Sequence, residues 1–209
     1  MTARAPDLSR ALEALQAPTA PARRAAAKRL RRLKDPSAGP ALLDALRREI
    51  REPRAWETQY QLIMALGESG YEPALPYFHE LAGQGFEATM LYVALGDAIV
   101  RLGRRSANDP APVLDLMAMP NSMLTDGAFR AVAMLRLALD SRTIEAIISR
   151  VSSFDPNDGL RFWVAAAAAG WSGPSVQRFL AACATSSRED IRTAALGSQQ
   201  RKYRRWRPL

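Results

Sequence analysis

Apolar residues recur at positions i, i+3, i+4 and i+7 along most of the chain, and polar residues fill the positions between them. This spacing is typical of amphipathic helices, and no segment alternates with a period of two for long enough to indicate a strand. The chain is therefore predicted to be all-α. The pattern places helices near residues 8–16, 20–34, 37–51, 54–67, 72–84, 87–102, 110–119, 123–139, 141–153, 157–169, 174–185 and 188–206.

The helical pattern itself repeats at intervals of 30 to 40 residues. A shift of residues 22–46 by 36 positions aligns Leu30 with Leu66, Pro40 with Pro76, Leu42 with Phe78 and Ala45 with Leu81. A shift of 32 positions near the other end aligns Ile144 with Val176, Ile147 with Phe179, Ile148 with Leu180 and Val151 with Cys183. Each unit is a helix, a tight turn and a second helix, so the sequence predicts an array of helix pairs.

Several residues of the first unit form a recognisable motif, namely Arg24, Ala26 and Leu30 on the first helix and Asp35, Pro36, Pro40 and Leu42 at and after the turn. This motif resembles the short bacterial HEAT repeat, the type also seen in proteins related to phycocyanobilin lyase subunits. The resemblance returns at residues 65–78 and 191–196 and is weak over residues 87–121, where a polar insertion, RRSANDP, separates two helices.

The resemblance implies a right-handed α-α superhelix, a HEAT-like or armadillo-like solenoid of about five helix pairs between end helices. Residues 1–209 are expected to form one domain, because each repeat buries its apolar face only against its neighbours. Residues 1–19 are expected to cap the array, 20–187 to hold the repeats, and 188–209 to form the last helix and a basic tail. A flexible N-terminal arm, with residues 17–22 as a stiff linker, is the alternative for the first segment.

Composition excludes several classes of protein and site. A charged segment followed by an apolar one, as in a signal peptide, is missing at the start, and the longest uncharged run, residues 162–177, is interrupted by two glycines and a proline. A cytoplasmic protein without a membrane segment is therefore expected. Cys183 is the single cysteine and falls on an apolar helical face, which indicates a buried structural thiol.

Residues for catalysis are scarce in the sequence. His79 is the only histidine, and its helical position places it away from the apolar face. The chain shows no glycine-rich phosphate loop, no paired-carboxylate signature and no metal motif. We therefore expect no cofactor, no metal and no enzymatic activity.

Charge is unevenly distributed along the chain. The net charge is +7 over residues 1–54, −4 over 55–187 and +5 over 188–209. Arg24, Lys28, Arg31 and Arg32 are predicted to lie opposite the core face of the first repeat, and there we favour a solvated surface. The C-terminal segment interleaves aromatic and basic residues, which favours a binding role, although Tyr203 and Trp206 could instead fold back onto the last repeat. This basic tail comprises Arg201, Lys202, Tyr203, Arg204, Arg205, Trp206 and Arg207.

The enzymatic alternative is a relative of the bacterial DNA alkylpurine glycosylases, which are also HEAT-like arrays with basic concave faces. Their active surface groups tryptophans with an aspartate. In this chain Trp56 and Trp163 are predicted to lie in the core, and Trp171, at a turn, is the remaining candidate. Fold analogy carries little functional weight, so we do not favour this alternative.

The function expected from the sequence is non-catalytic protein binding by the second helices, which line the concave surface of a HEAT array. The role would be that of an adaptor, a regulatory subunit or an immunity protein, and the partner another protein, with an acidic surface, rather than nucleic acid. The predicted groove residues, those second-helix positions that point away from the core, are Asp44, Arg47, Arg48, Arg51, His79, Glu80, Glu145, Ser149, Gln177 and Arg178.

Overall fold

A computed structural model describes residues 4–203, and within that range the fold is helical throughout, without strands. Twelve α-helices are present there, matching in number and order those expected from the sequence. The chain divides into two compact units, and the division falls between Gly103 and Arg104. This boundary coincides with the start of the RRSANDP insertion.

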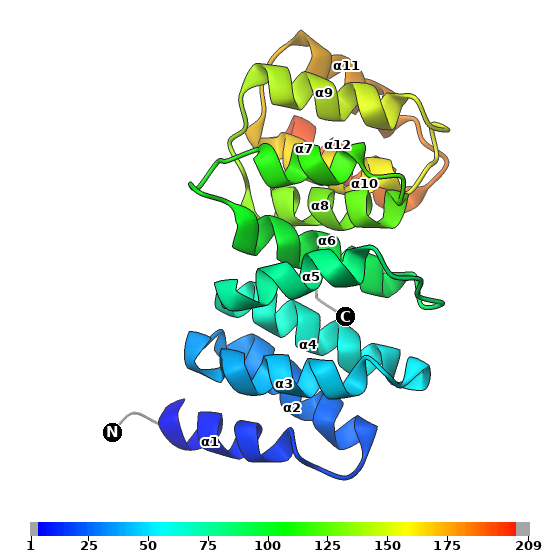
Figure 1. Ribbon diagram of the computed structural model, residues 1–209. Coiled ribbons are helices and arrows are strands. Elements are labelled where there is room, and N and C mark those ends of the chain that lie inside the picture. Colours follow the sequence, from blue (N-terminus) through cyan, green and yellow to red (C-terminus); the bar gives the residue numbers. More distant parts are fainter. Residues whose placement is uncertain (1–3, 204–209) are drawn as a thin grey trace. The chain divides into compact units, whose positions relative to one another are not determined.

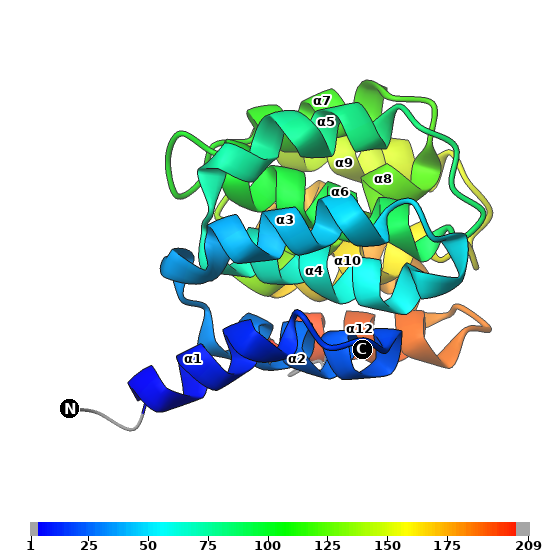
Figure 2. The same cartoon turned by 60° about the horizontal axis from the view of Figure 1, so that its bottom comes forward.

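Unit 1 holds the first six helices, shown in blue to green in Figure 1: α1 (Arg4–Ala14), α2 (Ala20–Leu33), α3 (Gly39–Glu49), α4 (Trp56–Ser69), α5 (Leu75–Ala82) and α6 (Met90–Gly103). The first helices of successive repeats, α2, α4 and α6, pack on one another in sequence order. The second helices pack against the next first helix, α3 on α4 and α5 on α6, while α1 covers α2 (Figure 2).

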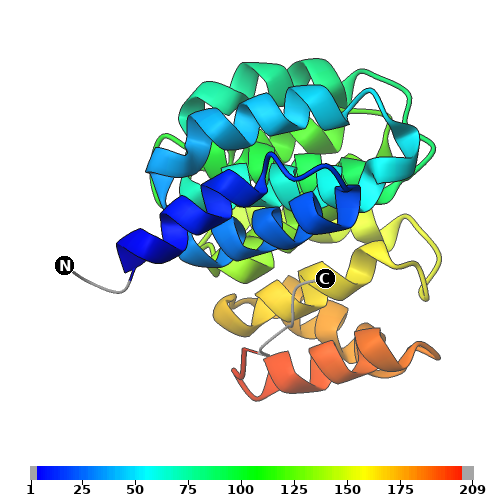
Figure 3. The ribbon, with the colours of Figure 1, turned by 90° about the horizontal axis from the view of Figure 1, so that it is seen from below.

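Unit 2 repeats the same arrangement with α7 (Ala111–Ala118), α8 (Ser122–Leu135), α9 (Ser141–Ser152), α10 (Leu160–Ala167), α11 (Pro174–Ala184) and α12 (Glu189–Gln199). Here α8, α10 and α12 pack in order, α7 lies on α8, and α9 packs against both α10 and α11. Figure 3 shows α12 at the end of this unit, beside α10 and α11.

Short capping motifs determine where the helices start. Asn121 Oδ1 accepts a 3.0 Å hydrogen bond from the Met123 amide, and Asp140 Oδ1 accepts one of 3.0 Å from the Thr143 amide, as N-caps do. Three helices, α3, α4 and α5, are each preceded by a 3-10 turn with proline near its start, over Pro36–Ala38, Pro53–Ala55 and Glu72–Ala74. The predicted starts of these helices fall in or next to those turns, because proline favours both a 3-10 turn and a first helical turn.

The aligned apolar positions of the repeats are buried as predicted. Leu30 and Leu66, Leu42 and Phe78, and Ala45 and Leu81 all lie in the core of unit 1, and the four aligned pairs of α9 and α11 lie in the core of unit 2. The two shifts of 36 and 32 residues therefore describe real structural repeats.

First helices are buried over most of their circumference, whereas the sequence pattern predicted a single buried face for each of them. Every residue from Leu91 to Val100 on α6 is buried, and so is every residue from Thr58 to Gly67 on α4. Arg31 of α2, predicted to be solvated, is only 3% exposed. That prediction was wrong because α2 packs against the next first helix, α4, as well as against α1.

Candidate functional site

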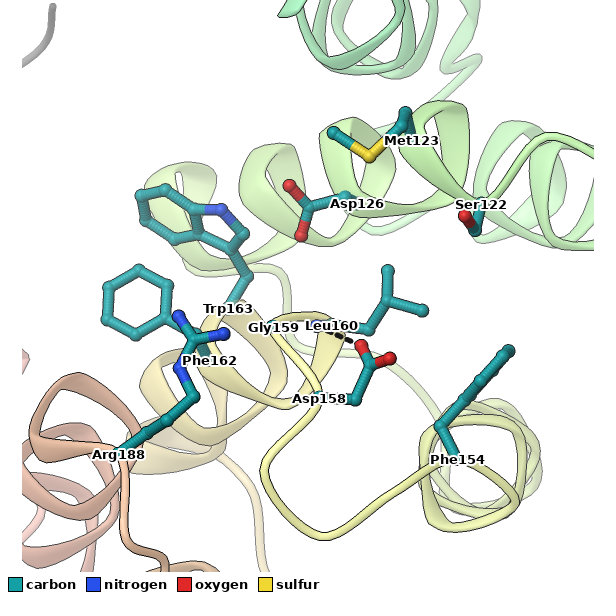
Figure 4. A pocket seen from close by; sticks show the side chains of 10 residues that line it. All are labelled: Ser122, Met123, Asp126, Phe154, Asp158, Gly159, Leu160, Phe162, Trp163 and Arg188. Atoms are coloured by element: carbon teal, nitrogen blue, oxygen red, sulfur yellow. Dashed lines mark hydrogen bonds between the residues drawn. The ribbon is translucent and has the colours of Figure 1, made fainter. Parts of the chain in front are cut away.

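A cavity of about 360 Å³ opens in unit 2 at the N-terminal ends of α8 and α10, and we call it the aromatic-acidic cavity (Figure 4). Its volume falls in the range of small-ligand sites. Four of its residues decide its chemistry: Asp126, Asp158, Trp163 and Arg188. The remaining lining residues are apolar or small, namely Ser122, Met123, Phe154, Gly159, Leu160 and Phe162.

Aromatic side chains form one wall of the cavity. The rings of Phe162 and Trp163 meet edge to face, with centroids 4.7 Å apart and an interplanar angle of 67°. The Arg130 guanidinium lies over the Trp163 ring at 5.6 Å from its centroid. Phe154 forms the opposite end of the cavity in Figure 4, where the Arg150 guanidinium lies 5.0 Å from its ring centroid.

The carboxylate of Asp126 projects from α8 toward the Trp163 side of the cavity (Figure 4). Burial raises the pKa of Asp126 from 3.8 to about 7; Arg130 and Arg188 lower it, Asp158 adds to the rise, and burial outweighs the two cations. Among residues 4–203, no amide or side chain donates a hydrogen bond to this carboxylate. A partly buried carboxyl without a hydrogen-bond donor is unusual and marks a candidate functional group.

The other charged groups of the cavity already have partners. Asp158 Oδ1 accepts a 2.8 Å hydrogen bond from the Leu160 amide at the start of α10. Arg188 donates from Nε to Asp190 Oδ1 at 3.0 Å and from Nη2 to Asp190 Oδ2 at 2.5 Å. Asp126 is therefore the carboxylate of this cavity that remains available to a ligand.

The sequence predicted neither Asp126 nor the cavity. Asp126 follows Leu124 and Thr125 and precedes a buried run, so its helix reads as an ordinary core helix. Because the cavity forms only where α8, the loop before α10 and the start of α12 come together, no local spacing signals it. The one available clue was an aspartate inside a largely apolar helical segment.

The ten predicted groove residues are all exposed in the structure, as expected. Asp44, Arg47, Arg48, Arg51, His79 and Glu80 belong to unit 1, whereas Glu145, Ser149, Gln177 and Arg178 belong to unit 2. None of them lines the aromatic-acidic cavity; Arg48 and Gln177 border two smaller cavities of about 280 and 270 Å³. Their role in partner binding stays a prediction.

Within unit 1 a contact between second helices joins part of this set. The Arg47 guanidinium of α3 lies over the Tyr77 ring of α5 at 5.5 Å from its centroid, and Arg47 Nη1 is 3.8 Å from Asp44 Oδ1. The pKa of Tyr77 is raised by burial and by the negative charge of Glu80. The sequence did not single out Tyr77, which is half-buried between the two helices.

The C-terminal segment folds back onto unit 2 as far as the structure describes it. The Tyr203 ring lies under the Arg136 guanidinium, 4.4 Å from the ring centroid, and Arg201 Nη1 donates a 2.5 Å hydrogen bond to the Trp171 carbonyl. The fold-back that the sequence left as an alternative is therefore present for Tyr203. Arg201 and Lys202 are exposed, and Arg204, Arg205, Trp206 and Arg207 lie outside the described residues.

The tryptophans do not lie as predicted. Trp56 is 36% exposed at the start of α4 rather than in the core. Trp163 lines the aromatic-acidic cavity with Asp126, while Trp171, the candidate from the sequence, is buried and donates from Nε1 to the Leu137 carbonyl at 3.1 Å. Cys183 is buried as expected, and burial raises the pKa of its thiol.

Comparison with known proteins identifies the repeat. Residues 22–48 match the family described as PBS lyase HEAT-like repeat. The chain is a HEAT-repeat protein. No curated protein matches this HEAT-repeat protein over its sequence. Among solved structures it is similar to human deoxyhypusine hydroxylase in complex with glycerol, with 12% identity, a TM-score of 0.44, and coverage of 93% of this chain and 83% of that one.

This likeness corrects one expectation from the sequence. The HEAT-repeat protein was expected not to be an enzyme, but the similar solved structure is that of an enzyme, so enzymatic activity is no longer excluded. The likeness assigns no reaction or substrate to this chain. Within residues 4–203, no helix has the length and apolar character needed to cross a membrane.

Proposed function

We propose that this HEAT-repeat protein is a scaffold that binds another protein through the exposed faces of its second helices. The observation that carries the proposal is the Arg47–Tyr77 contact, which joins α3 and α5 into one exposed surface on a tightly packed layer of first helices. We call this the α3–α5 surface and define it by Arg47, Arg48, Arg51, Tyr77 and Glu80.

The chemistry of the α3–α5 surface suits a protein partner with an acidic face. Arg47 and Arg51 lie near Tyr77, while Arg48 of the same helix donates to Gln16 of α1. Arginine and tyrosine are enriched among the residues that dominate binding energy in protein interfaces. Because the underlying helices are packed on buried leucine and phenylalanine side chains, little ordering entropy is lost on binding. An adaptor, a regulatory subunit and an immunity-type inhibitor are three forms of this function, and the partner's identity distinguishes them.

Site-specific crosslinking in the source cells tests the proposal. A photoreactive amino acid replaces Arg48 or Arg51 in turn, and Glu13, an exposed residue of α1, serves as the control position. We expect one protein to be crosslinked from positions 48 and 51 but not from 13, and the crosslink to be lost when Arg47→Glu is added. Crosslinks only to nucleic acid, or the same proteins from all three positions, would overturn the proposal.

A second candidate function is favoured by one specific observation, the presence of Asp126 and Trp163 in the same cavity. This grouping is what the resemblance to alkylpurine glycosylases implies for a nucleic-acid enzyme. Incubation with duplex DNA carrying alkylated purines tests this candidate, with release of the modified base as the readout. Release by the native protein but not by Asp126→Asn supports it, and equal release by both excludes it.

A further inference from the structure

The aromatic-acidic cavity has an unusual combination of a carboxylate and aromatic rings. Asp126 receives no hydrogen bond from residues 4–203, and Phe154, Phe162 and Trp163 supply ring surfaces around it. Carboxylate and ring faces together attract a cation, the first by charge and hydrogen bonds and the second through the negative face of the ring.

The arginines around the cavity are engaged by groups other than the Asp126 carboxylate. Arg188 is held by Asp190 through two hydrogen bonds, and the Asp158 carboxylate accepts from the Leu160 amide. Arg130 is the cation on the same helix as Asp126, while Arg161 on α10 donates instead to the Asp155 and Phe154 carbonyls. Arg150 lies over the Phe154 ring at the other end of the cavity.

A guanidinium fits this cavity better than an ammonium. It is planar, is more weakly hydrated than an ammonium, stacks on aromatic faces and can donate two parallel hydrogen bonds to one carboxylate.

We propose that the aromatic-acidic cavity binds the guanidinium of an arginine side chain from a partner protein, with the Asp126 carboxylate as its counter-ion and the Trp163 and Phe162 rings as its wall. This inference rests on the proposed protein-binding function and specifies one feature of the partner. It makes the partner a protein that presents an arginine on a projecting segment, since the cavity is enclosed by α8, α10 and the start of α12.

The test uses short capped peptides of one length, Gly-Arg-Gly, Gly-Lys-Gly and Gly-citrulline-Gly, titrated into the full chain and followed by backbone amide NMR shifts of residues 122–126 and 158–163. Citrulline keeps the shape of arginine and removes its charge. We expect the arginine peptide to bind about 10-fold more tightly than the citrulline peptide, the difference that one charge-assisted hydrogen-bonded pair supplies. The lysine peptide is expected to be weaker than the arginine peptide.

Variants assign the binding to Asp126. Asp126→Asn preserves shape and is expected to weaken the arginine peptide about 10-fold, whereas the matched control Asp115→Asn, an exposed carboxyl of α7, leaves binding unchanged. Trp163→Leu, which removes the ring but keeps apolar bulk, is also expected to weaken binding. Circular dichroism and thermal unfolding show whether each variant is folded.

The binding is also expected to depend on pH through Asp126. The native protein is expected to bind the arginine peptide more tightly at pH 8 than at pH 6, because the carboxyl is charged at the higher pH, and Asp126→Asn is expected to show no such dependence. Tighter binding at pH 6 than at pH 8 in the native protein would overturn the assignment.

The other outcomes have definite meanings. Equal binding of arginine and citrulline peptides, or tighter binding of the lysine peptide, overturns the guanidinium assignment. Tighter binding of 7-methylguanosine, a cationic nucleoside, overturns it in favour of a nucleic-acid ligand. A protein crosslinked through positions 48 and 51 without arginine-peptide binding means that only the inference fails, whereas arginine-peptide binding without a crosslinked protein means that the proposed function fails.

Discussion

Arg31 Nε donates a hydrogen bond of 2.8 Å to Glu68 Oε1, and this contact joins α2 to α4 across two successive repeats. Both side chains are largely buried, with 4% and 11% of their surface exposed. Arg31 Nη1 also donates to Gln61 Oε1 at 3.1 Å, and its guanidinium lies 5.9 Å from the Tyr60 ring centroid. The stack of first helices in unit 1 therefore contains a buried polar network as well as apolar packing.

Replacement of Glu68 by alanine should destabilise unit 1 strongly. The change leaves the buried Arg31 guanidinium without its counter-ion, and the loss of one partner of a buried ion pair costs about 3 kcal/mol. Urea unfolding followed by circular dichroism measures the effect. Glu87→Ala, at an exposed position, is the control and should change the free energy of unfolding by less than about 0.5 kcal/mol. Arg31→Met added to Glu68→Met should recover part of the loss, and no recovery would argue against the ion pair as the cause.

Replacement of Gly67 by alanine should loosen the contact between α4 and α6. A Cβ atom at residue 67 would lie 2.8 Å from the Ala98 Cβ and 2.9 Å from the Ala98 Cα, so the two helices must separate. Overpacking of this kind costs about 1–3 kcal/mol, which exceeds the gain in helix propensity of about 1 kcal/mol. Gly85→Ala, where nothing lies within 4 Å of the added Cβ, is the matched control. Equal melting temperatures for the two variants would contradict the close approach.

Helix positions and the repeat register were predictable from the sequence because both depend on local spacing. Leu42 and Phe78 occupy aligned positions in successive second helices and are both fully buried. A second helix packs mainly on one side, so a single apolar face describes it well.

First helices were predicted less well, because their neighbours come from distant parts of the sequence. Arg31 was placed on the solvated side of the helical wheel, yet Glu68 and Gln61 of the next first helix surround it. Leu196, one of the residues that carry the resemblance to a last half repeat, is 46% exposed. No first helix follows α12 among residues 4–203 to cover it.

The candidate site was not predictable for the same reason. Two helix pairs separate Asp126 from Arg188 in the sequence. The two residues therefore come together only after α8, α10 and α12 have packed. The exposed α3–α5 surface was predicted in part, since Arg47 and Arg51 are at polar positions of a short amphipathic helix. Tyr77 was missed because an aromatic residue on such a helix usually belongs to the core.

Replacement of Trp171 by phenylalanine should weaken unit 2. The indole Nε1 donates to the Leu137 carbonyl at 3.1 Å, and the side chain is 3% exposed. Phenylalanine leaves that carbonyl without its indole donor, which costs about 1–3 kcal/mol. Trp56→Phe, at a position 36% exposed, provides the comparison and should have little effect. If chemical denaturation gave equal losses for both variants, the hydrogen bond would contribute nothing particular to stability.

Replacement of Asp126 by asparagine should change how stability depends on pH. Burial raises the pKa of Asp126 to about 7 in the folded protein from an ordinary value of 3.8, so the folded state holds a proton that the unfolded state has released between about pH 4 and 7. The native protein therefore loses stability as the pH rises through that window. The folded state must then either bury a charged Asp126 carboxylate or keep a proton that the unfolded state has released.

The asparagine side chain cannot ionise, so the Asp126→Asn variant should gain stability relative to the native protein as the pH rises. The difference in unfolding free energy between variant and native protein should grow by about 1–3 kcal/mol from pH 4 to pH 8 and change little above that. Guanidinium unfolding at pH 4, 6 and 8 measures this difference, and Asp115→Asn, at an exposed carboxyl of α7, is the control. A difference that stayed constant across the three pH values would show that the pKa of Asp126 is the same in the folded and unfolded states, and that burial does not raise it.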